Sequence, residues 1–185
     1  MRDGAGNVKR ACYDARFLRQ PTMSTPIRPM LGADLAAVLK VQAACYPPAM
    51  QETAAVVAAR RQAAAATCLV AEDADGVCGY LFAYPSRRGL VTALDAPFCI
   101  APDADTLYLH DLAVAPRALG RGLARSLVQS MLALGRAHGL AHAALVAVQD
   151  SARFWRAQGF EVQAGQYAGL AGYPAGSLYM LRTPL

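Results

Sequence analysis

The sequence lacks the features that would indicate a membrane span, a disulfide framework or a zinc site. Its cysteines form an odd set without a C-x-x-C pair: Cys12, Cys45, Cys68, Cys78 and Cys99. Such a set fits a reducing compartment better than structural disulfides or a metal centre. Every apolar stretch is broken by Arg, Gln, His or Asp before it reaches the roughly 18 to 20 residues that a membrane helix needs. We therefore expect a soluble, cytoplasmic protein without a metal.

Charged residues are also few, at 17% of the chain, whereas 55% of the residues are hydrophobic, which is ample for a core and excludes disorder over most of the length. The net charge of +5 favours anionic ligands without the dense basic clusters of a nucleic-acid binder. Residues 1–22 carry five basic and two acidic side chains but no secretory h-region. We expect residues 1–24 to be a disordered extension, a transit peptide being the alternative, and residues 25–185 to be the domain.

The apolar pattern predicts alternating strands and helices over residues 25–185, with no internal repeat and no linker. A strand at 25–30 precedes a helix that Pro47 ends, an Ala-rich helix from residue 51 to about 66, and two strands joined by the turn "DADG". A strand at 107–114, a helix at about 122–138, a strand at 143–148, a short helix ended by Gly159 and two closing strands follow. This order predicts a single mixed α/β domain.

The segment "GRGLA", which begins at Gly120, lies between a strand and the start of a helix. Glycines let the backbone approach a ligand, and the free N–H groups of a first helical turn bind anions. The alternative is a tight turn whose glycines only satisfy backbone angles. A dinucleotide fingerprint lacks its third glycine here, and a P-loop would require G-K-[S/T].

The block "LHDLAVAPRALGRGLARSLV", the later "FWRAQGF" and the order of elements resemble the acetyl-CoA-binding core of the GNAT N-acetyltransferase superfamily, over about residues 26–184. Within it, "LHDLAV", "GRG" and "GSLYMLR" are most similar to arylalkylamine (serotonin) N-acetyltransferases. The resemblance implies acetyl-CoA as cosubstrate. It also implies a mixed, mostly antiparallel twisted sheet of about seven strands, flanked by about four helices and splayed between the fourth and fifth strands.

The resemblance also implies which residues would bind the cosubstrate. Those that would wrap the pyrophosphate are Gly120, Arg121, Gly122, Leu123, Ala124 and Arg125. Those that would pair by backbone with the pantetheine arm are Leu112, Ala113 and Val114. The family's phosphate motif fits in two registers, with either Leu119 or Arg117 at its first position, and we prefer Leu119. Arg121 and Arg125 could equally be solvated arginines at a helix start.

The catalytic residues implied by the resemblance lie in the strand at 107–114. His110 stands at the position of one of two proton-relay histidines, and Tyr108 stands at the other. A structural role in the core is the alternative for His110. A bulge is expected in this strand, with a backbone N–H in the 112–114 segment polarising the thioester carbonyl. Asp111 is expected to face the opposite side as a structural residue, unless the bulge rotates it.

Trp155 stands where the family usually has the tyrosine that protonates the departing thiolate, a task that indole cannot perform. It could pack against the cosubstrate or form part of the core. The acid could instead be water or one of four tyrosines: Tyr108, Tyr167, Tyr173 or Tyr179.

The acceptor pocket is predicted at the break between the first two helices and at the loop "GQYAGLAGYPAG". Its predicted lining is Tyr46, Pro47, Met50 and Tyr173. This composition favours an arylalkylamine over a polyamine. We predict an acetyl-CoA-dependent N-acetyltransferase of a small primary amine, a monomer or homodimer without membrane or nucleic-acid partners. The alternatives are acetylation of a protein N-terminus or an aminoacyl-tRNA, or a sensor that binds acyl-CoA with little catalysis.

Overall fold

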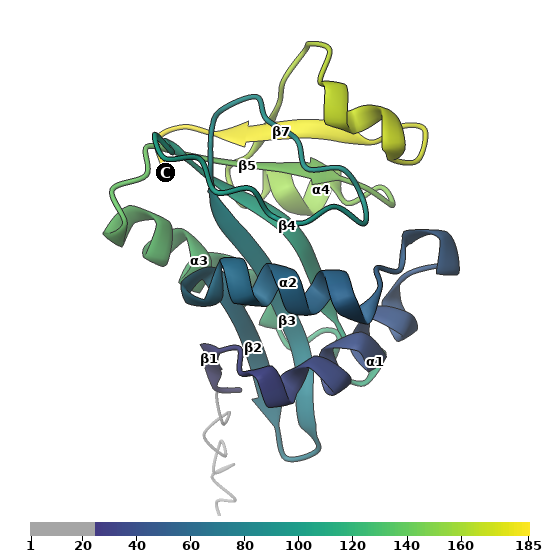
Figure 1. Cartoon of the computed structure of the whole chain (residues 1–185). Helices are drawn as coiled ribbons and strands as arrows, with labels where there is room; N and C mark the ends of the chain where they lie inside the picture. Colours follow the sequence, from purple (N-terminus) through teal and green to yellow (C-terminus); the bar gives the residue numbers. More distant parts are fainter. Residues whose placement is uncertain (1–24) are drawn as a thin grey trace, which may run out of the picture.

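Seven strands form one sheet in the order β1-β2-β3-β4-β5-β7-β6, in a computed structural model that describes residues 25–185 (Figure 1). The strands are β1 (Ile27–Pro29), β2 (Cys68–Asp73), β3 (Gly76–Ser86), β4 (Thr106–Val114), β5 (His142–Ala147), β6 (Glu161–Val162) and β7 (Leu178–Arg182). All neighbouring pairs are antiparallel except β4 and β5, which are parallel. The predicted sheet is thereby confirmed. The predicted extension at residues 1–24 lies outside the described residues.

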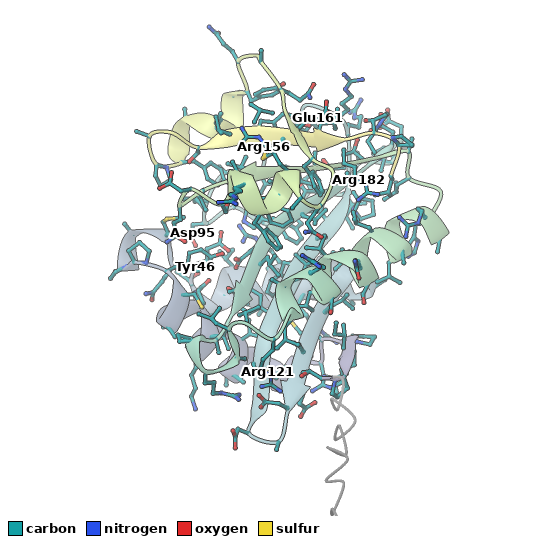
Figure 2. All side chains as sticks on the ribbon, turned by 180° about the vertical axis from the view of Figure 1, so that it is seen from behind. Tyr46, Asp95, Arg121, Arg156, Glu161 and Arg182 are labelled. Atoms are coloured by element: carbon teal, nitrogen blue, oxygen red, sulfur yellow. The ribbon has the colours of Figure 1, made fainter. Side chains whose placement is uncertain are left out.

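Two helices cover each face of the sheet. Helices α1 (Leu35–Cys45) and α2 (Ala54–Ala63) pack on the face that Figure 1 shows in front, and α3 (Leu123–Ala137) and α4 (Ala152–Arg156) cover the other face, which Figure 2 shows. In β3, Tyr80, Phe82 and Tyr84 belong to the core under α1 and α2. Leu81 and Ala83 belong to the core under α3 and α4. Alternation along the strand therefore supplies both layers. Within residues 25–185 no helix is both long and apolar enough to cross a bilayer.

The second helix is shorter than the sequence predicts. Instead of starting at residue 51, α2 begins after Thr53, whose hydroxyl oxygen accepts a hydrogen bond from the Val56 N–H at 3.3 Å, a typical N-cap. The preceding Glu52 stays outside the helix and turns its side chain into the protein. At the other end, residues Ala65–Thr67 form a separate 3₁₀ turn. The prediction placed Glu52 within the helix, whereas in the structure it precedes the helix and is buried.

A bulge in β4 coincides with the point where the sheet splays. Phe82 pairs with Asp111 and Ala83 pairs with Leu109, so His110 is the extra residue of the bulge. The parallel ladder between β4 and β5 also ends at Leu109. Beyond that residue β4 continues beside β3 alone, and β5 and β7 run in a different direction (Figure 1). The predicted bulge and splay are both present, and they open a gap in the sheet beside His110.

Candidate active site

The gap between the separated strands is a groove with a volume of about 240 Å³. Its walls are β4 and β5, the end of α1 and the aromatic side chains Phe154 and Trp155 of α4. Leu112 and Val114 line it, whereas Ala113 is buried in the core on the α1 side. The 112–114 segment pairs with β3 along one edge and has no strand partner on the β5 side. This edge lies along the groove where the sequence predicts the pantetheine arm.

The start of α3 forms a second hollow, of about 330 Å³, next to the groove. Gly120 and Gly122 both have φ of +76°, a conformation that favours glycine, and a Cβ at either would meet no other atom. The first hydrogen bond of the helix runs from the Ser126 N–H to the Gly122 carbonyl. The three amides before Ser126 therefore have no partner within the helix. A helix start of this kind is suited to a phosphate group.

The two predicted phosphate arginines are placed differently. Arg121 donates to Asp73 at 3.0 Å and to the Thr25 hydroxyl at 3.2 Å, which holds it at the β2–β3 hairpin (Figure 2). Arg117 shares the same carboxylate, at 2.6 and 2.7 Å. Arg125 lines the hollow and, within residues 25–185, makes no ion pair. Only Arg125 therefore directs a free charge to the glycine-rich hollow.

His110 is paired with a carboxylate that the sequence analysis did not single out. Its Nε2 lies 3.2 Å from Oε1 of Glu52, and the two side chains are only 2% and 6% exposed. The same Oε1 accepts the Asp95 N–H at 3.2 Å, and the other oxygen of Glu52 pairs with Arg60. Arg60 is itself buried under the ring of Phe98, 5.0 Å from its centroid. Glu52 is thus fixed from three sides and almost fully buried.

This environment keeps Glu52 ionised. Burial alone would raise the pKa of Glu52, but the hydrogen bond and charge of His110, together with the charge of Arg60, outweigh burial and lower the pKa to about 2. An ionised Glu52 accepts a hydrogen bond from Nε2–H of His110. The lone pair of a neutral His110 then resides on Nδ1, which is buried and has no hydrogen-bond partner among residues 25–185. Nδ1 is therefore the nitrogen that could accept a proton.

The bulge brings Asp111 to the same side as His110, so the expectation that it faces away does not hold. Both residues line the groove and a second, smaller cavity. The Tyr46 hydroxyl lies 2.8 Å from one oxygen of Asp111, and the Tyr80 hydroxyl lies 2.7 Å from the other. Burial raises the pKa of Asp111, and these two hydrogen bonds act in the opposite direction. In a regular strand Asp111 would point to the other face.

The second cavity, which we call the acceptor cavity, has a volume of only about 30 Å³. Three of the four residues predicted for the acceptor line it, namely Tyr46, Met50 and Tyr173, whereas Pro47 is exposed outside it. Glu52, His110 and Asp111 add charged and polar groups. The predicted apolar and aromatic pocket is therefore more polar than its sequence segments indicate.

Two loops contribute to the wall of the acceptor cavity. Residues 87–105 supply Leu94, and residues 163–177 supply Tyr173. The two loops are joined directly, because the Tyr173 hydroxyl donates to the Thr92 carbonyl at 2.8 Å. Gly169 lies against Val91 so closely that a Cβ at this glycine would overlap the Val91 carbonyl oxygen. Figure 2 shows Tyr46 and Asp95 together on the same side of the splayed strands. The cavity is thus lined by segments that are far apart in the sequence.

A family model of the acetyltransferase (GNAT) family matches residues 35–160, more than half of the 185-residue chain. The chain belongs to this family. It is therefore an acyltransferase by family, as the sequence predicts, and the groove and the glycine-rich hollow lie within the matched residues. A comparison with curated protein sequences finds no match.

Solved structures of GNAT proteins share the fold. The GphF GNAT-like decarboxylase in complex with isobutyryl-CoA is 16% identical, with a TM-score of 0.73 over 85% of this chain and 98% of that one. A GCN5-related N-acetyltransferase from Kribbella flavida is 24% identical, with a TM-score of 0.60 over 86% and 97%. The ribosomal-protein-S18-alanine N-acetyltransferase from Escherichia coli is 14% identical, with a TM-score of 0.60 over 86% and 93%. At these low sequence identities the similarity supports a shared fold but does not identify the acceptor.

Trp155 serves the groove and the core of this GNAT domain at once. It is 7% exposed and makes edge contacts with Phe154 and Phe160, at centroid distances of 5.0 and 5.5 Å. One side of it also lines the groove. The two alternatives considered for this residue are therefore compatible.

The other predicted catalytic residue, Tyr108, lies deeper in the domain. Its ring is buried 6.1 Å from that of His110, its hydroxyl has no hydrogen-bond partner, and it lines neither the groove nor the acceptor cavity. Burial raises its pKa well above the ordinary tyrosine value. Of the tyrosines that could replace the missing acid, Tyr173 lines the acceptor cavity, while Tyr167 and Tyr179 pack against each other away from it. Tyr46 is the tyrosine that lines the groove.

The residues that sequence reasoning missed are Glu52, Arg60 and Phe98. One signal was present: Glu52 is the only acidic residue between Asp34 and Glu72, in a stretch dominated by alanine and valine. An isolated charge in an apolar segment, with an arginine eight positions later, indicates a buried pair as readily as a solvated helix. Phe98, in a loop with two prolines nearby, carried no such signal. No group of three or more His, Cys, Asp or Glu side chains that could hold a metal ion is found in the described part of the chain.

Proposed function

We propose that this protein is an acetyl-CoA-dependent N-acetyltransferase that transfers acetyl directly to the primary amine of a small acceptor. The observation that carries the proposal is the buried Glu52–His110 pair, positioned where the groove meets the acceptor cavity. His110 lines both spaces, so a base, a thioester and an amine could meet at one point. Bringing two substrates together in this way supplies much of the rate of a transfer reaction.

The residues of the groove fit the cosubstrate. The free amides at the start of α3 and the charge of Arg125 suit a pyrophosphate, and the apolar groove beside Leu112 and Val114 suits a pantetheine arm. The bound cosubstrate would supply the acetyl group as a thioester. The bulge at His110 disturbs the ladder there, which supports a role for a nearby backbone N–H in polarising the carbonyl.

The proton would pass through His110. Nδ1 of His110 takes a proton from the arriving ammonium, and Glu52 stabilises the imidazolium through Nε2–H. The amine nitrogen then bonds to the carbonyl carbon and the C–S bond breaks. The second proton lost by the nitrogen neutralises the thiolate. Because a thiol with a pKa of about 8.5 is a good leaving group, no acid is needed at the position of Trp155.

The small volume of the acceptor cavity supports a small acceptor, and its aromatic lining, Tyr46 and Tyr173, supports the arylalkylamine resemblance. One of the structurally similar proteins is a ribosomal-protein-S18-alanine N-acetyltransferase. A peptide amine is therefore the alternative acceptor that a test must include. The aminoacyl-tRNA alternative and the sensor alternative make different predictions in the same experiment.

The test combines binding with turnover. Addition of acetyl-CoA should raise the melting temperature, whereas NAD and ATP should not. Turnover should then be measured with arylalkylamines, alkylamines, diamines and an alanine-starting peptide. We expect turnover with at least one small amine and little with the peptide. An unchanged melting temperature would refute the cosubstrate assignment, and a shift without turnover would identify a sensor.

A further inference from the structure

Asp111 is a half-buried carboxylate that makes no ion pair with a cation of the described chain. Its two hydrogen-bond donors are tyrosine hydroxyls, from Tyr46 of α1 and Tyr80 of β3. None of the ion pairs within residues 25–185 includes it. An uncompensated carboxylate in such a place is unfavourable unless a ligand brings the opposite charge.

Asp111 lies where the groove meets the acceptor cavity. It lines both the groove and the acceptor cavity, and His110 and Tyr46 are among the few residues that share this property. A carboxylate can accept about four hydrogen bonds, and the tyrosines supply one to each oxygen. Acceptor capacity therefore remains on Asp111 at the junction where a reacting nitrogen would lie.

The charges around the acceptor cavity fix how many positive charges it can accept. The carboxylate of Glu52 is balanced by Arg60, and His110 adds no charge in the neutral form that its proposed role as base requires. Cys45, Tyr46 and Tyr80, which also face Asp111, are uncharged at neutral pH because their pKa values are raised, first of all by burial. One negative charge is left. The remaining wall is formed by the apolar side chains Met50, Leu94, Val146 and Val148 and by Tyr173, whose hydroxyl donates to the Thr92 carbonyl.

We propose that Asp111 recognises the ammonium group of the acceptor, so that the site selects monocationic primary amines over neutral nucleophiles and over diamines. This inference rests on the proposed function, since it concerns the same site. Asp111 would hold the ammonium beside His110 until the proton is transferred. A second positive charge would have to lie against this mostly apolar wall, which explains the exclusion of diamines.

The test uses probes of matched shape. Phenethylamine and O-benzylhydroxylamine have the same number of heavy atoms, as do ethylamine and methoxyamine, but only the amines are cations at neutral pH. Butylamine and 1,3-diaminopropane compare one charge with two. Binding to the CoA-loaded protein is measured by calorimetry at pH 7, and kcat/KM is measured wherever turnover occurs.

We expect the native protein to bind each amine at least about tenfold more tightly than its neutral partner, the range of one charged hydrogen bond. Asp111→Asn should abolish this preference by weakening the amines about 10- to 100-fold while leaving the neutral probes nearly unchanged. Tyr80→Phe removes one hydrogen bond but keeps the charge, so the preference should persist. The melting temperature and its shift with acetyl-CoA report whether each variant is folded.

Several results would overturn the inference. These are the absence of any preference in the native protein, a failure of all probes to bind, and an equal loss for both members of a pair in Asp111→Asn. The comparison of amines with neutral probes on the native protein tests the inference even if Asp111→Asn does not fold. Charge-selective binding without turnover would refute the proposed function alone, whereas turnover of amines without charge selectivity would refute this inference alone.

Discussion

The two ends of the groove are built in opposite ways. The hollow at the start of α3 consists mostly of residues within 118–125, is open, and offers backbone amides and glycines. The acceptor end gathers side chains from the end of α1, residue 52, loop 87–105, β4 and loop 163–177. One short segment of sequence can therefore form a phosphate site, whereas the acceptor site is formed only when distant segments fold together. Substitutions at the first end should mainly affect cosubstrate binding, and those at the second should affect chemistry and stability together.

The strongest test of this contrast is Gly122→Asp. A carboxylate at this helix start would repel phosphate and remove a left-handed glycine, so we expect acetyl-CoA affinity to fall about 10³-fold, the loss of two charged hydrogen bonds. Gly139→Asp is the matched control, because Gly139 also has a positive φ and open space but lies beyond the other end of α3. Calorimetric titration measures both variants. Similar losses in the two would show that strain, not charge, is responsible.

At the acceptor end, His110→Gln should lower kcat/KM about 10²-fold near neutral pH, as expected for loss of a general base. The loss should shrink at high pH, where more of the amine is already neutral. His138→Gln, at the exposed end of α3, should leave the profile unchanged. A loss that does not vary with pH would return His110 to a purely structural role.

Glu52→Gln should destabilise the fold in a way that depends on pH, because it removes a charge. The folded pKa of about 2 lies below the ordinary value of 4.5, so ionised Glu52 stabilises the protein fully above about pH 4.5 and loses this contribution as the pH falls toward 2. The difference corresponds to about 3 kcal/mol at pH 7.

Urea unfolding at pH 7 and pH 3 should therefore show a large gap between the native protein and Glu52→Gln that narrows in acid. Glu161→Gln, on the exposed edge strand β6, is the control and should match the native protein at both values. A gap that stays constant with pH would mean that the stabilisation does not come from the charge of Glu52.

A smaller effect distinguishes the two arginines at the start of α3. Arg125→Ala should weaken acetyl-CoA binding about fivefold, and more at low salt, because its charge faces the hollow without a protein partner. Arg121→Ala should change the affinity less than about twofold, because Asp73 and Thr25 already hold that side chain. The reverse order would mean that Arg121 leaves Asp73 when the cosubstrate binds.

The smallest effect is expected for Trp155→Phe. Since indole supplies packing and no proton, kcat should stay within about threefold of the native value, while stability falls by about 1 kcal/mol. Steady-state turnover and urea unfolding measure the two quantities. Loss of turnover in a folded variant that still binds acetyl-CoA would contradict the account of the missing acid.

The sequence predicted the parts of the molecule that depend on local pattern. The period of apolar residues located α3 to within one residue at each end, and "GRGLA" located the hollow at its start. Glu52 could not be assigned in this way, because its partners His110 and Arg60 are 58 and 8 positions away and meet only through tertiary packing. Asp111 was misplaced because alternation along a strand fails at a bulge, which the sequence does not locate to the residue.

The contact between Gly169 and Val91 has a consequence for how this enzyme could change its acceptor. The two loops can approach this closely because glycine has no Cβ. Any side chain at Gly169 would overlap Val91 and push the two loops apart. The carbonyl of Thr92, which follows Val91, accepts the hydrogen bond from Tyr173. A shift of this loop would therefore displace Tyr173 in the wall of the acceptor cavity. A single methyl group at a position that touches no substrate could in this way widen the range of amines that enter.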